Sequence, residues 1–318
     1  MVDAMSLTRR DLGKIALAAL PAAGLPAAAK PNSKFNGVQI GINAPYSYRG
    51  MPGTAEDVLK YNLEVGLSAV ELRSQPVEDY LGAPNIPGVT SGRFRGTPTP
   101  EQAAALADLN KWRLGLSMDK LKTFRKMYED AGVLIQIVKV DAIETMSEDI
   151  VDYYFTMVKA LGAKALSCEI PVSRTKWLGE IAAKHKVMVG YHGHAKVNDP
   201  EAFASPASWE RAMSFSKYNG INLDIGHFIA GNNVSPVEFL KKYHDRVTHI
   251  HLKDRKMKDG PNFVWGQGET PIVEVLQLLK KEKYPFQATI EFEYKPPEDS
   301  TVLAEIGKCV QYCKKALA

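Results

Sequence analysis

A carboxylate and an imidazole lie three residues apart in the stretch 221–231, which reads INLDIGHFIAG. Asp224 and His227 follow an apolar run that is typical of a buried strand. Aspartate oxygens and histidine nitrogens are common ligands for divalent cations, so the pair is a candidate metal site. Taken alone, the pair is equally compatible with a hydrogen-bonded strand-end aspartate and a surface histidine. The choice therefore depends on whether the neighbouring strands end in the same way.

Metal-competent side chains recur at the ends of five consecutive apolar runs. They are Glu169, His192, His194, Asp224, His227, His251, Asp254, Glu291 and Glu293. Residues two apart in a strand point to the same side, so His192 pairs with His194 and Glu291 pairs with Glu293. Burying so many ionisable groups without partners would cost several kcal/mol each, and a bound cation removes that cost. The sequence therefore predicts a divalent-metal site, which would also act as a Lewis acid.

Eight short apolar runs, mostly separated by helix-like stretches, supply these positions. The runs are residues 38–44, 68–73, 133–140, 165–170, 187–192, 221–225, 247–252 and 288–292. The helix-like stretches are residues 54–65, 147–161, 176–185, 236–243, 272–281 and 301–317. Alternating strands and helices imply parallel strands joined by right-handed crossovers, and eight such units predict a single-domain (β/α)8 TIM barrel. In that fold the active site lies where the strands end, which is where the candidate residues are.

One connection is much longer than the others. Residues 75–116 separate the second run from the segments that lead to the third, and up to residue 100 they are rich in proline and glycine. Helix-like segments follow at 101–111 and 117–130. Because loops of this length in a compact domain are usually functional or disordered, we interpret residues 75–116 as a lid or substrate wall.

The N-terminus has the pattern of an export signal. Arg9 and Arg10 precede a run rich in alanine and leucine, and small residues follow at 27–29. The arginine pair resembles a twin-arginine signal. We therefore expect residues 1–29 to direct export to the periplasm and residues 30–318 to form the barrel. The apolar run is too short for a convincing membrane span, so we expect no membrane anchor.

The composition narrows the range of partners. Of the 318 residues, 45% are hydrophobic and 24% are charged, which is ordinary for a globular protein. The formal net charge is +4 without a basic tract, so the sequence offers no nucleic-acid surface. The composition leaves a small molecule and, at most, further copies of the same chain as the expected partners.

At four motifs the chain resembles the xylose isomerase-like superfamily of TIM barrels, which contains sugar isomerases, epimerases and dehydratases and the endonuclease IV type of DNA-repair nuclease. The motifs are Asp224-Ile-Gly-His227, His249-Ile-His251-Leu-Lys-Asp254, Gly266-Gln-Gly268-Glu269 and Thr289-Ile-Glu291-Phe-Glu293. The resemblance covers essentially everything after the signal. In the ketose epimerases of this superfamily, a Glu, an Asp, a His and a Glu from strands five to eight bind one Mn, Mg or Co ion. The resemblance thus implies Asp224, His251 and Glu291 as ligands, with His192 at the strand-five position.

His192 departs from the pattern of the epimerases, which have glutamate there and use both glutamates in proton transfer. The base is therefore expected to be Glu169 or Glu293. The ligand set also stays open between His192 and Glu169, and between Glu291 and Glu293. The resemblance further implies a substrate contact for His227, and Lys253 is expected either to hold a substrate oxygen or to form a salt bridge with Asp254.

Our leading hypothesis is a sugar isomerase or epimerase that uses one divalent ion, Mn, Mg, Co or Zn. Glu169 or Glu293 would remove a proton next to the polarised carbonyl of a keto-sugar or glycoside, giving an enediolate. Reprotonation on the other face would give an epimer, and loss of a β-substituent would give an elimination product. The alternatives are a metal-dependent hydrolase, with water positioned by His194 or Asp254, and a non-catalytic periplasmic sugar-binding barrel.

The nuclease branch of the superfamily fits the sequence poorly. That branch carries three zinc ions and needs further histidines from early strands, but no histidine precedes His185. It also needs an Asp-x-His soon after the seventh strand, where residues 262–265 read NFVW. The sequence therefore favours a single-metal carbohydrate enzyme.

Overall fold

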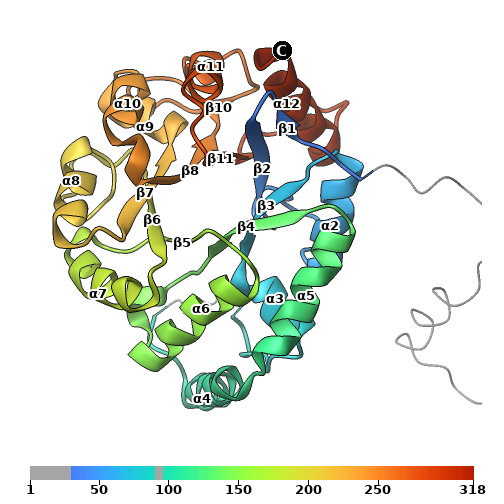
Figure 1. The fold of residues 1–318 in the computed structure, drawn as a ribbon, viewed down its shortest axis with the longest axis vertical. Coiled ribbons are helices and arrows are strands. Elements are labelled where there is room, and N and C mark those ends of the chain that lie inside the picture. The colour runs from blue at the N-terminus through green and yellow to red at the C-terminus, as the bar shows by residue number, and fades with distance from the viewer. Residues whose placement is uncertain (1–29, 90–95) are drawn as a thin grey trace, which may run out of the picture.

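A computed structural model describes residues 30–89 and 96–318 (Figure 1). The expected export signal, residues 1–29, and residues 90–95 of the long connection lie outside the described residues. Twin-arginine export and a periplasmic location therefore stay predictions. Among the described residues, no helix is both long enough and apolar enough to cross a membrane.

Eight parallel strands close into a barrel, as the alternating pattern predicted. They are β2 (Val38–Ala44), β3 (Ala69–Arg73), β4 (Leu134–Lys139), β5 (Ala165–Cys168), β6 (Met188–His192), β7 (Asn219–Asp224), β8 (Val247–Leu252) and β11 (Gln287–Ile290). Each strand pairs in parallel with the next, and β2 pairs with both β3 and β11, which closes the ring. Because such strands are covered on both faces, they read in the sequence as nearly continuous apolar runs.

Helices ring the strands, as Figure 1 shows. They are α2 (Ala55–Glu64), α3 (Ser74–Tyr80), α4 (Pro100–Gly115), α5 (Met118–Asp130), α6 (Glu148–Ala160), α7 (Thr175–His185), α8 (Pro206–Phe215), α9 (Ile225–Asn232), α10 (Val237–Tyr243), α11 (Ile272–Glu282) and α12 (Val302–Ala316). Two short antiparallel pairs complete the sheet structure: β1 (Lys34–Phe35) with β2, and β9 (Asp254–Arg255) with β10 (Asn262–Phe263). The six helices expected outside the long connection are present within one or two residues of their predicted ends. Of the two segments expected at 101–111 and 117–130, the first extends to Gly115 as α4 and the second matches α5 within one residue.

Helix α9 corrects the interpretation of the Asp224–His227 stretch. We expected the strand to continue to residue 225 and the next helix to begin only at residue 236. The strand ends at Asp224, and Ile225 already begins the helix. The reason is local, because Asp224 Oδ1 accepts the backbone N–H of His227 at 2.7 Å, the contact of a helix N-cap. Asp224 therefore starts a helix and ends a strand at once, which fixes the direction of its carboxylate.

The long connection 75–116 contains more regular structure than expected. It holds most of α3 and all of α4, and the N-cap of α4, Thr99, forms a reciprocal capping box with Gln102. A buried ion pair joins the two helices, since Arg113 Nε and Nη2 donate to the two oxygens of Glu78 at 2.8 and 2.9 Å. None of the described residues 75–116 lines the cavity at the candidate site, so the role as a lid stays a prediction.

Candidate metal centre

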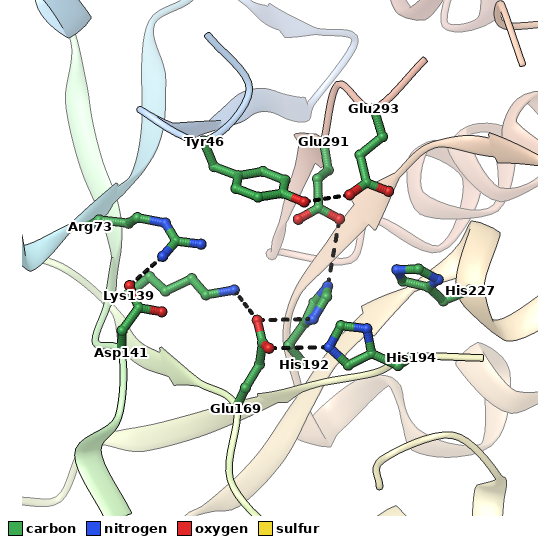
Figure 2. Close-up of a pocket in the computed structure, with 10 residues that line it drawn as sticks. All are labelled: Tyr46, Arg73, Lys139, Asp141, Glu169, His192, His194, His227, Glu291 and Glu293. Carbon is green, nitrogen blue, oxygen red and sulfur yellow. Dashed lines mark hydrogen bonds and ion pairs between the residues drawn. The ribbon is translucent and has the colours of Figure 1, made fainter. Parts of the chain in front are cut away.

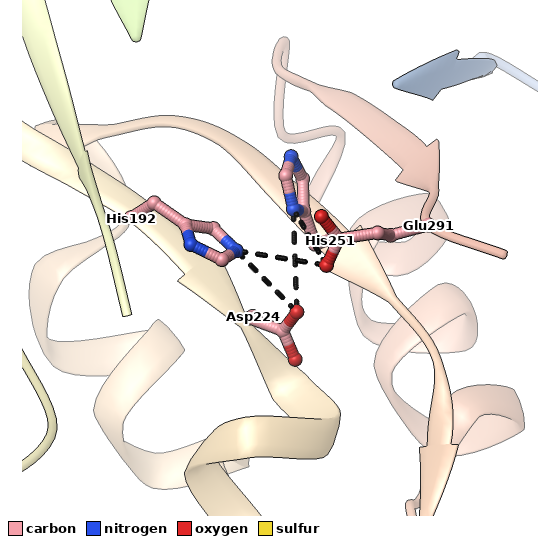
Figure 3. A group of neighbouring side chains, drawn as sticks. All are labelled: His192, Asp224, His251 and Glu291. Atoms are coloured by element: carbon pink, nitrogen blue, oxygen red, sulfur yellow. Dashed lines mark ion pairs between the residues drawn. The ribbon is translucent and has the colours of Figure 1, made fainter. Parts of the chain in front are cut away.

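Four side chains from the second half of the barrel converge at the carboxyl ends of the strands (Figure 3). His192 ends β6, Asp224 ends β7, His251 lies in β8 and Glu291 directly follows β11. His192 Nε2 is 3.5 Å from Asp224 Oδ2 and 3.6 Å from Glu291 Oε2. His251 Nδ1 is 3.3 Å from Glu291 Oε2 and 4.0 Å from Asp224 Oδ2. One ligand atom from each residue thus lies within 4.8 Å of all the others.

The four residues fit a divalent cation. All four are at least 97% buried, yet His192 Nε2, Asp224 Oδ2, His251 Nδ1 and Glu291 Oε2 have no hydrogen-bond partner. Such orphaned polar atoms are costly unless something binds them. Ligands about 2.1 Å from one tetrahedral ion would be about 3.4 Å apart, close to the separations observed. Two imidazoles and two carboxylates are a donor set that suits Zn, Mn, Co or Fe.

Lys253 also reaches this cluster. Its Nζ lies 2.9 Å from Asp224 Oδ2 and 2.5 Å from Glu291 Oε2, close enough for strong charge attraction although the alignment is not that of a hydrogen bond. It donates a hydrogen bond to Glu293 Oε2 at 2.7 Å. Lys253 therefore balances three carboxylates, and the expected alternative of a salt bridge with Asp254 is wrong.

Asp254 has a structural role. Its two oxygens accept the backbone N–H groups of Gly266, Gly268 and Thr270 at 2.7 to 3.1 Å. A Cβ at position 268 would lie 2.0 Å from Asp254 Oδ1, so only glycine fits there. The Gly266-Gln-Gly268-Glu269 motif is thus a loop folded around one carboxylate, and Asp254 is not directed at the four-residue cluster.

The cluster rests on an inner layer of polar side chains that the sequence analysis missed. Glu71, in the middle of β3, is fully buried, and its Oε2 is 2.5 Å from His251 Nε2 and 3.3 Å from His249 Nε2. Asn43 donates to Glu291 Oε1 at 2.9 Å. Partners of this kind fix the orientation of a metal ligand and raise its basicity. The signal for Glu71 was present, because it is a lone acid inside an apolar strand.

We expect Glu71→Gln to weaken divalent-metal affinity by about 10- to 100-fold without removing a ligand. The amide carries no charge, so it holds the Nε2–H of His251 less strongly than the carboxylate does. Isothermal titration of the metal-free protein with Zn²⁺ or Mn²⁺ measures the change. Glu64→Gln, at an exposed position of α2, is the matched control. An unchanged affinity in the Glu71 variant would show that this contact does not support the site.

The affinity should also rise with pH. In the metal-free site, burial opposes the charge on His251, but Glu71 and then Glu291 outweigh it and raise the pKa of His251 to about 10. A cation that binds Nδ1 displaces the hydrogen there, so below pH 10 binding releases a proton and the affinity increases about tenfold per pH unit. Titrations in two buffers of different ionisation enthalpy should give one released proton. An affinity that does not change with pH would contradict this account.

A cavity of about 350 Å³ opens over the cluster (Figure 2). Glu169 and Glu293 both line it, and neither belongs to the four-residue cluster. Glu169 accepts from Lys139 Nζ at 2.7 Å and lies 3.2 Å from His194 Nε2. Burial opposes ionisation of Glu169, but Lys139 and then His194 outweigh it, so the pKa of Glu169 lies well below its usual value. It is therefore an anion at neutral pH.

The second flanking carboxylate is held from the opposite side of the cavity. Glu293 Oε1 accepts from Tyr46 at 2.5 Å and from Arg49 at 3.0 Å, while Oε2 faces Lys253. Burial, and then the hydrogen bond to Glu293, raises the pKa of the Tyr46 phenol well above its usual value. Tyr46 thus keeps its hydrogen and is a proton donor that the sequence analysis did not find.

The structure therefore separates the candidates into two groups. His192, Asp224, His251 and Glu291 meet at one point, whereas Glu169, Glu293, His194 and His227 surround the cavity above it. Overlapping groups of metal-competent residues exist, but in them Glu71 is hydrogen-bonded to His251 and Glu169 is paired with Lys139. For the alternatives left open in the sequence, the geometry favours His192 over Glu169 and Glu291 over Glu293 as ligands.

A closed parallel barrel with two imidazoles and two carboxylates converging at its carboxyl end has the architecture of a metal-binding TIM barrel. The family described as xylose isomerase-like TIM barrel matches residues 151–307, the part of the chain that supplies all four converging residues. Residues 151–307 therefore carry the sequence pattern of the xylose isomerase-like TIM barrel family.

The chain is also similar to individual proteins, each at low sequence identity or over part of its length. An inosose dehydratase of Clostridium botulinum is 28% identical over 139 residues, which cover 37% of this chain and 45% of the relative. The chain thus spans less than half the length of this curated relative. The 3-keto-D-glucoside 4-epimerase YcjR of E. coli has a TM-score of 0.57 at 12% identity, covering 87% of this chain and 99% of that one. The IOLI protein, solved with a zinc atom, has a TM-score of 0.55 at 16% identity, covering 88% and 96%. At these identities the structural likeness shows the fold alone.

Proposed function

We propose that this protein is a divalent-metal-dependent enzyme that removes a proton from the carbon beside the carbonyl of a keto-sugar or glycoside. Epimerisation is the outcome we favour. The observation that carries the proposal is the convergence of four buried ligand atoms, none with a hydrogen-bond partner, beneath a cavity with a carboxylate on either side. The names of two similar proteins, an inosose dehydratase and a 3-keto-D-glucoside 4-epimerase, support the same chemistry.

A divalent ion, when bound to His192, Asp224, His251 and Glu291, supplies the Lewis acidity that makes the neighbouring C–H acidic. The remaining steps belong to the protein. Glu169 or Glu293 takes the proton, because each is anionic or ion-paired and faces the cavity. The other carboxylate takes up a proton from solvent during the reaction and delivers it to the opposite face of the substrate carbon.

β-Elimination is the second candidate, and the contact between Tyr46 and Glu293 favours it. An elimination needs an acid that protonates the departing hydroxyl group as well as a base. Tyr46 keeps its hydrogen and lies in the cavity at 2.5 Å from Glu293, so this pair could supply that acid. The product, an epimer or an unsaturated ketone, distinguishes the two reactions.

Hydrogen exchange with solvent tests the proposal directly. The purified protein, reconstituted with Zn²⁺ or Mn²⁺, is incubated in D₂O with keto-sugars and their methyl glycosides, and deuterium is located by NMR. Deuterium at the carbon beside the carbonyl, absent in the metal-free protein, is the expected result. Metal-loaded protein that exchanges none of them would contradict the proposal and favour a binding barrel. Solvent ¹⁸O in a cleaved product would instead indicate a hydrolase.

A further inference from the structure

A second cleft adjoins the cavity over the four-residue cluster. It measures about 370 Å³ and lies between the loop 45–53, which follows β2, and helix α3. Tyr46, Arg73 and Asp141 line both the first cavity and this second cleft. Figure 2 shows Arg73 and Asp141 on the side of the first cavity that is opposite His227. The second cleft therefore extends the first cavity away from that histidine.

The loop that forms one wall of the second cleft is held in place by its own contacts. The backbone N–H of Tyr48 donates to the carbonyl of Pro45 at 2.9 Å, and that of Met51 donates to the carbonyl of Tyr48 at 3.1 Å. Tyr48 is 1% exposed, and its hydroxyl donates to Asn62 Oδ1 of α2 at 2.6 Å. These contacts fix Met51 at the cleft. A site that is already formed loses little binding free energy to the ordering of its loop.

The lining of the second cleft combines apolar and polar groups. Pro45, Met51 and Pro76 supply apolar atoms, and the exposed Asp79 supplies a carboxylate. Arg73 Nε is buried and has no hydrogen-bond partner among the described residues. Small-molecule sites are typically apolar surfaces with a few polar groups that fix the orientation of the ligand. A sugar ring, which has apolar C–H faces and an edge of hydroxyl groups, matches this lining.

The charges of the second cleft favour a neutral ligand. Arg73 Nη1 is hydrogen-bonded to Asp141, and Arg49 Nη2 donates to Glu293 Oε1 at 3.0 Å. Both guanidinium groups that line the cleft thus already have a carboxylate partner, and Asp79 adds a further carboxylate. An anionic group would therefore meet carboxylates without an unpaired cation among the described lining residues. Hydroxyl groups can donate to the carboxylates and accept from the guanidinium groups.

We propose that the second cleft is a subsite for a second, neutral sugar ring, so that the substrate is a glycoside whose aglycone is itself a sugar. This inference rests on the proposed function and narrows its substrate class. The first cavity, of about 350 Å³, holds the reacting ring above the four-residue cluster, and the second ring lies between the loop 45–53 and α3. The start of the long connection is then a substrate wall. Contacts with a ring that does not react raise kcat/KM for the ring that does.

A comparison of two substrates tests the subsite. The methyl glycoside of a keto-pyranose and the disaccharide of the same keto-pyranose with glucose differ only in the aglycone. With the Zn²⁺- or Mn²⁺-loaded wild type, we expect kcat/KM to be at least about tenfold higher for the disaccharide. Met51→Trp, which fills the cleft, should remove this advantage and leave the value for the methyl glycoside within about twofold of wild type.

Two control variants accompany Met51→Trp. Met51→Leu keeps the volume of the side chain, and Met257→Trp lies at an exposed position outside the cleft, so both should retain the preference for the disaccharide. Equal kcat/KM for the two substrates in the wild type would overturn the proposal. Equal losses for both substrates in Met51→Trp would also overturn it, because they would show a general effect on the structure.

A binding measurement separates this proposal from the proposed function. In Zn²⁺-loaded protein with ¹³C-methyl-labelled methionine, the Met51 signal is assigned by its absence in Met51→Leu. The disaccharide should shift this signal, and the methyl glycoside should not. If the signal shifts but the wild type turns over neither compound, the proposed function fails and the subsite stands. An unshifted Met51 signal overturns the subsite, whatever the turnover. Tighter binding of a disaccharide that ends in a uronic acid would overturn the assignment of a neutral ring.

Discussion

Asp224→Asn should purify with less than stoichiometric divalent metal and should lower turnover by about a thousandfold. Asp224 Oδ2 is one of the four converging atoms, and the pKa of this carboxyl lies below its usual value because Lys253 and then His227 outweigh the effect of burial. The wild-type ligand is therefore an anion, which the amide is not. Loss of roughly 4 kcal/mol of Lewis-acid stabilisation corresponds to about a thousandfold in rate at about 1.4 kcal/mol per factor of ten.

The substitution is informative because it should leave the fold and its stability unchanged. The other oxygen of Asp224 caps α9 through the N–H of His227, and asparagine is as good an N-cap as aspartate. The variant should therefore unfold at nearly the same temperature as metal-free wild type while failing to bind Zn²⁺ or Mn²⁺ in elemental analysis and titration. Asp245→Asn, at an exposed position, controls for the loss of one carboxylate. If the Asp224 variant has the metal content of the wild type, the four-residue cluster is not the metal site.

The barrel was predictable from the sequence because its strands are buried on both faces. A strand such as β2, Val38–Ala44, has no polar side to interrupt its apolar run, so its observed and predicted ends coincide. The same burial makes polar residues at strand ends conspicuous, which is why Asp224, His251 and Glu291 could be singled out. The predicted strand ends were therefore enough to place the candidate ligands near one another.

The parts that the sequence did not reveal depend on contacts between distant residues. Glu71 and His251 are 180 positions apart, and no local pattern links them. Helix α9 was missed for a related reason, because its Gly226, Gly231 and branched residues have low helix propensity. An N-cap contact and packing against the barrel overrule that propensity. Local patterns thus located the ligands, and only the assembled structure shows what supports them.

The two carboxylates that flank the cavity should separate the possible reactions. Glu169→Gln and Glu293→Gln each remove a proton acceptor without touching the four converging atoms, so both variants should keep their metal. We expect each to lower kcat by about 10²- to 10⁴-fold, the usual contribution of a general acid or base. Glu180→Gln, at an exposed position of α7, is the control. If both variants retain more than about a tenth of wild-type turnover, neither carboxylate transfers the proton.

Deuterium exchange in the same variants then distinguishes epimerisation from elimination. In an epimerase the two carboxylates work on opposite faces of the substrate carbon, as their positions on two sides of the cavity in Figure 2 allow. Each variant should therefore exchange one epimer with D₂O and leave the other untouched, with the preference reversed between Glu169→Gln and Glu293→Gln. In an elimination only one carboxylate is the base. The variant that lacks the base should then exchange nothing. The other variant should exchange the substrate hydrogen without releasing water, because the pair of Tyr46 and Glu293 no longer delivers the proton to the departing group.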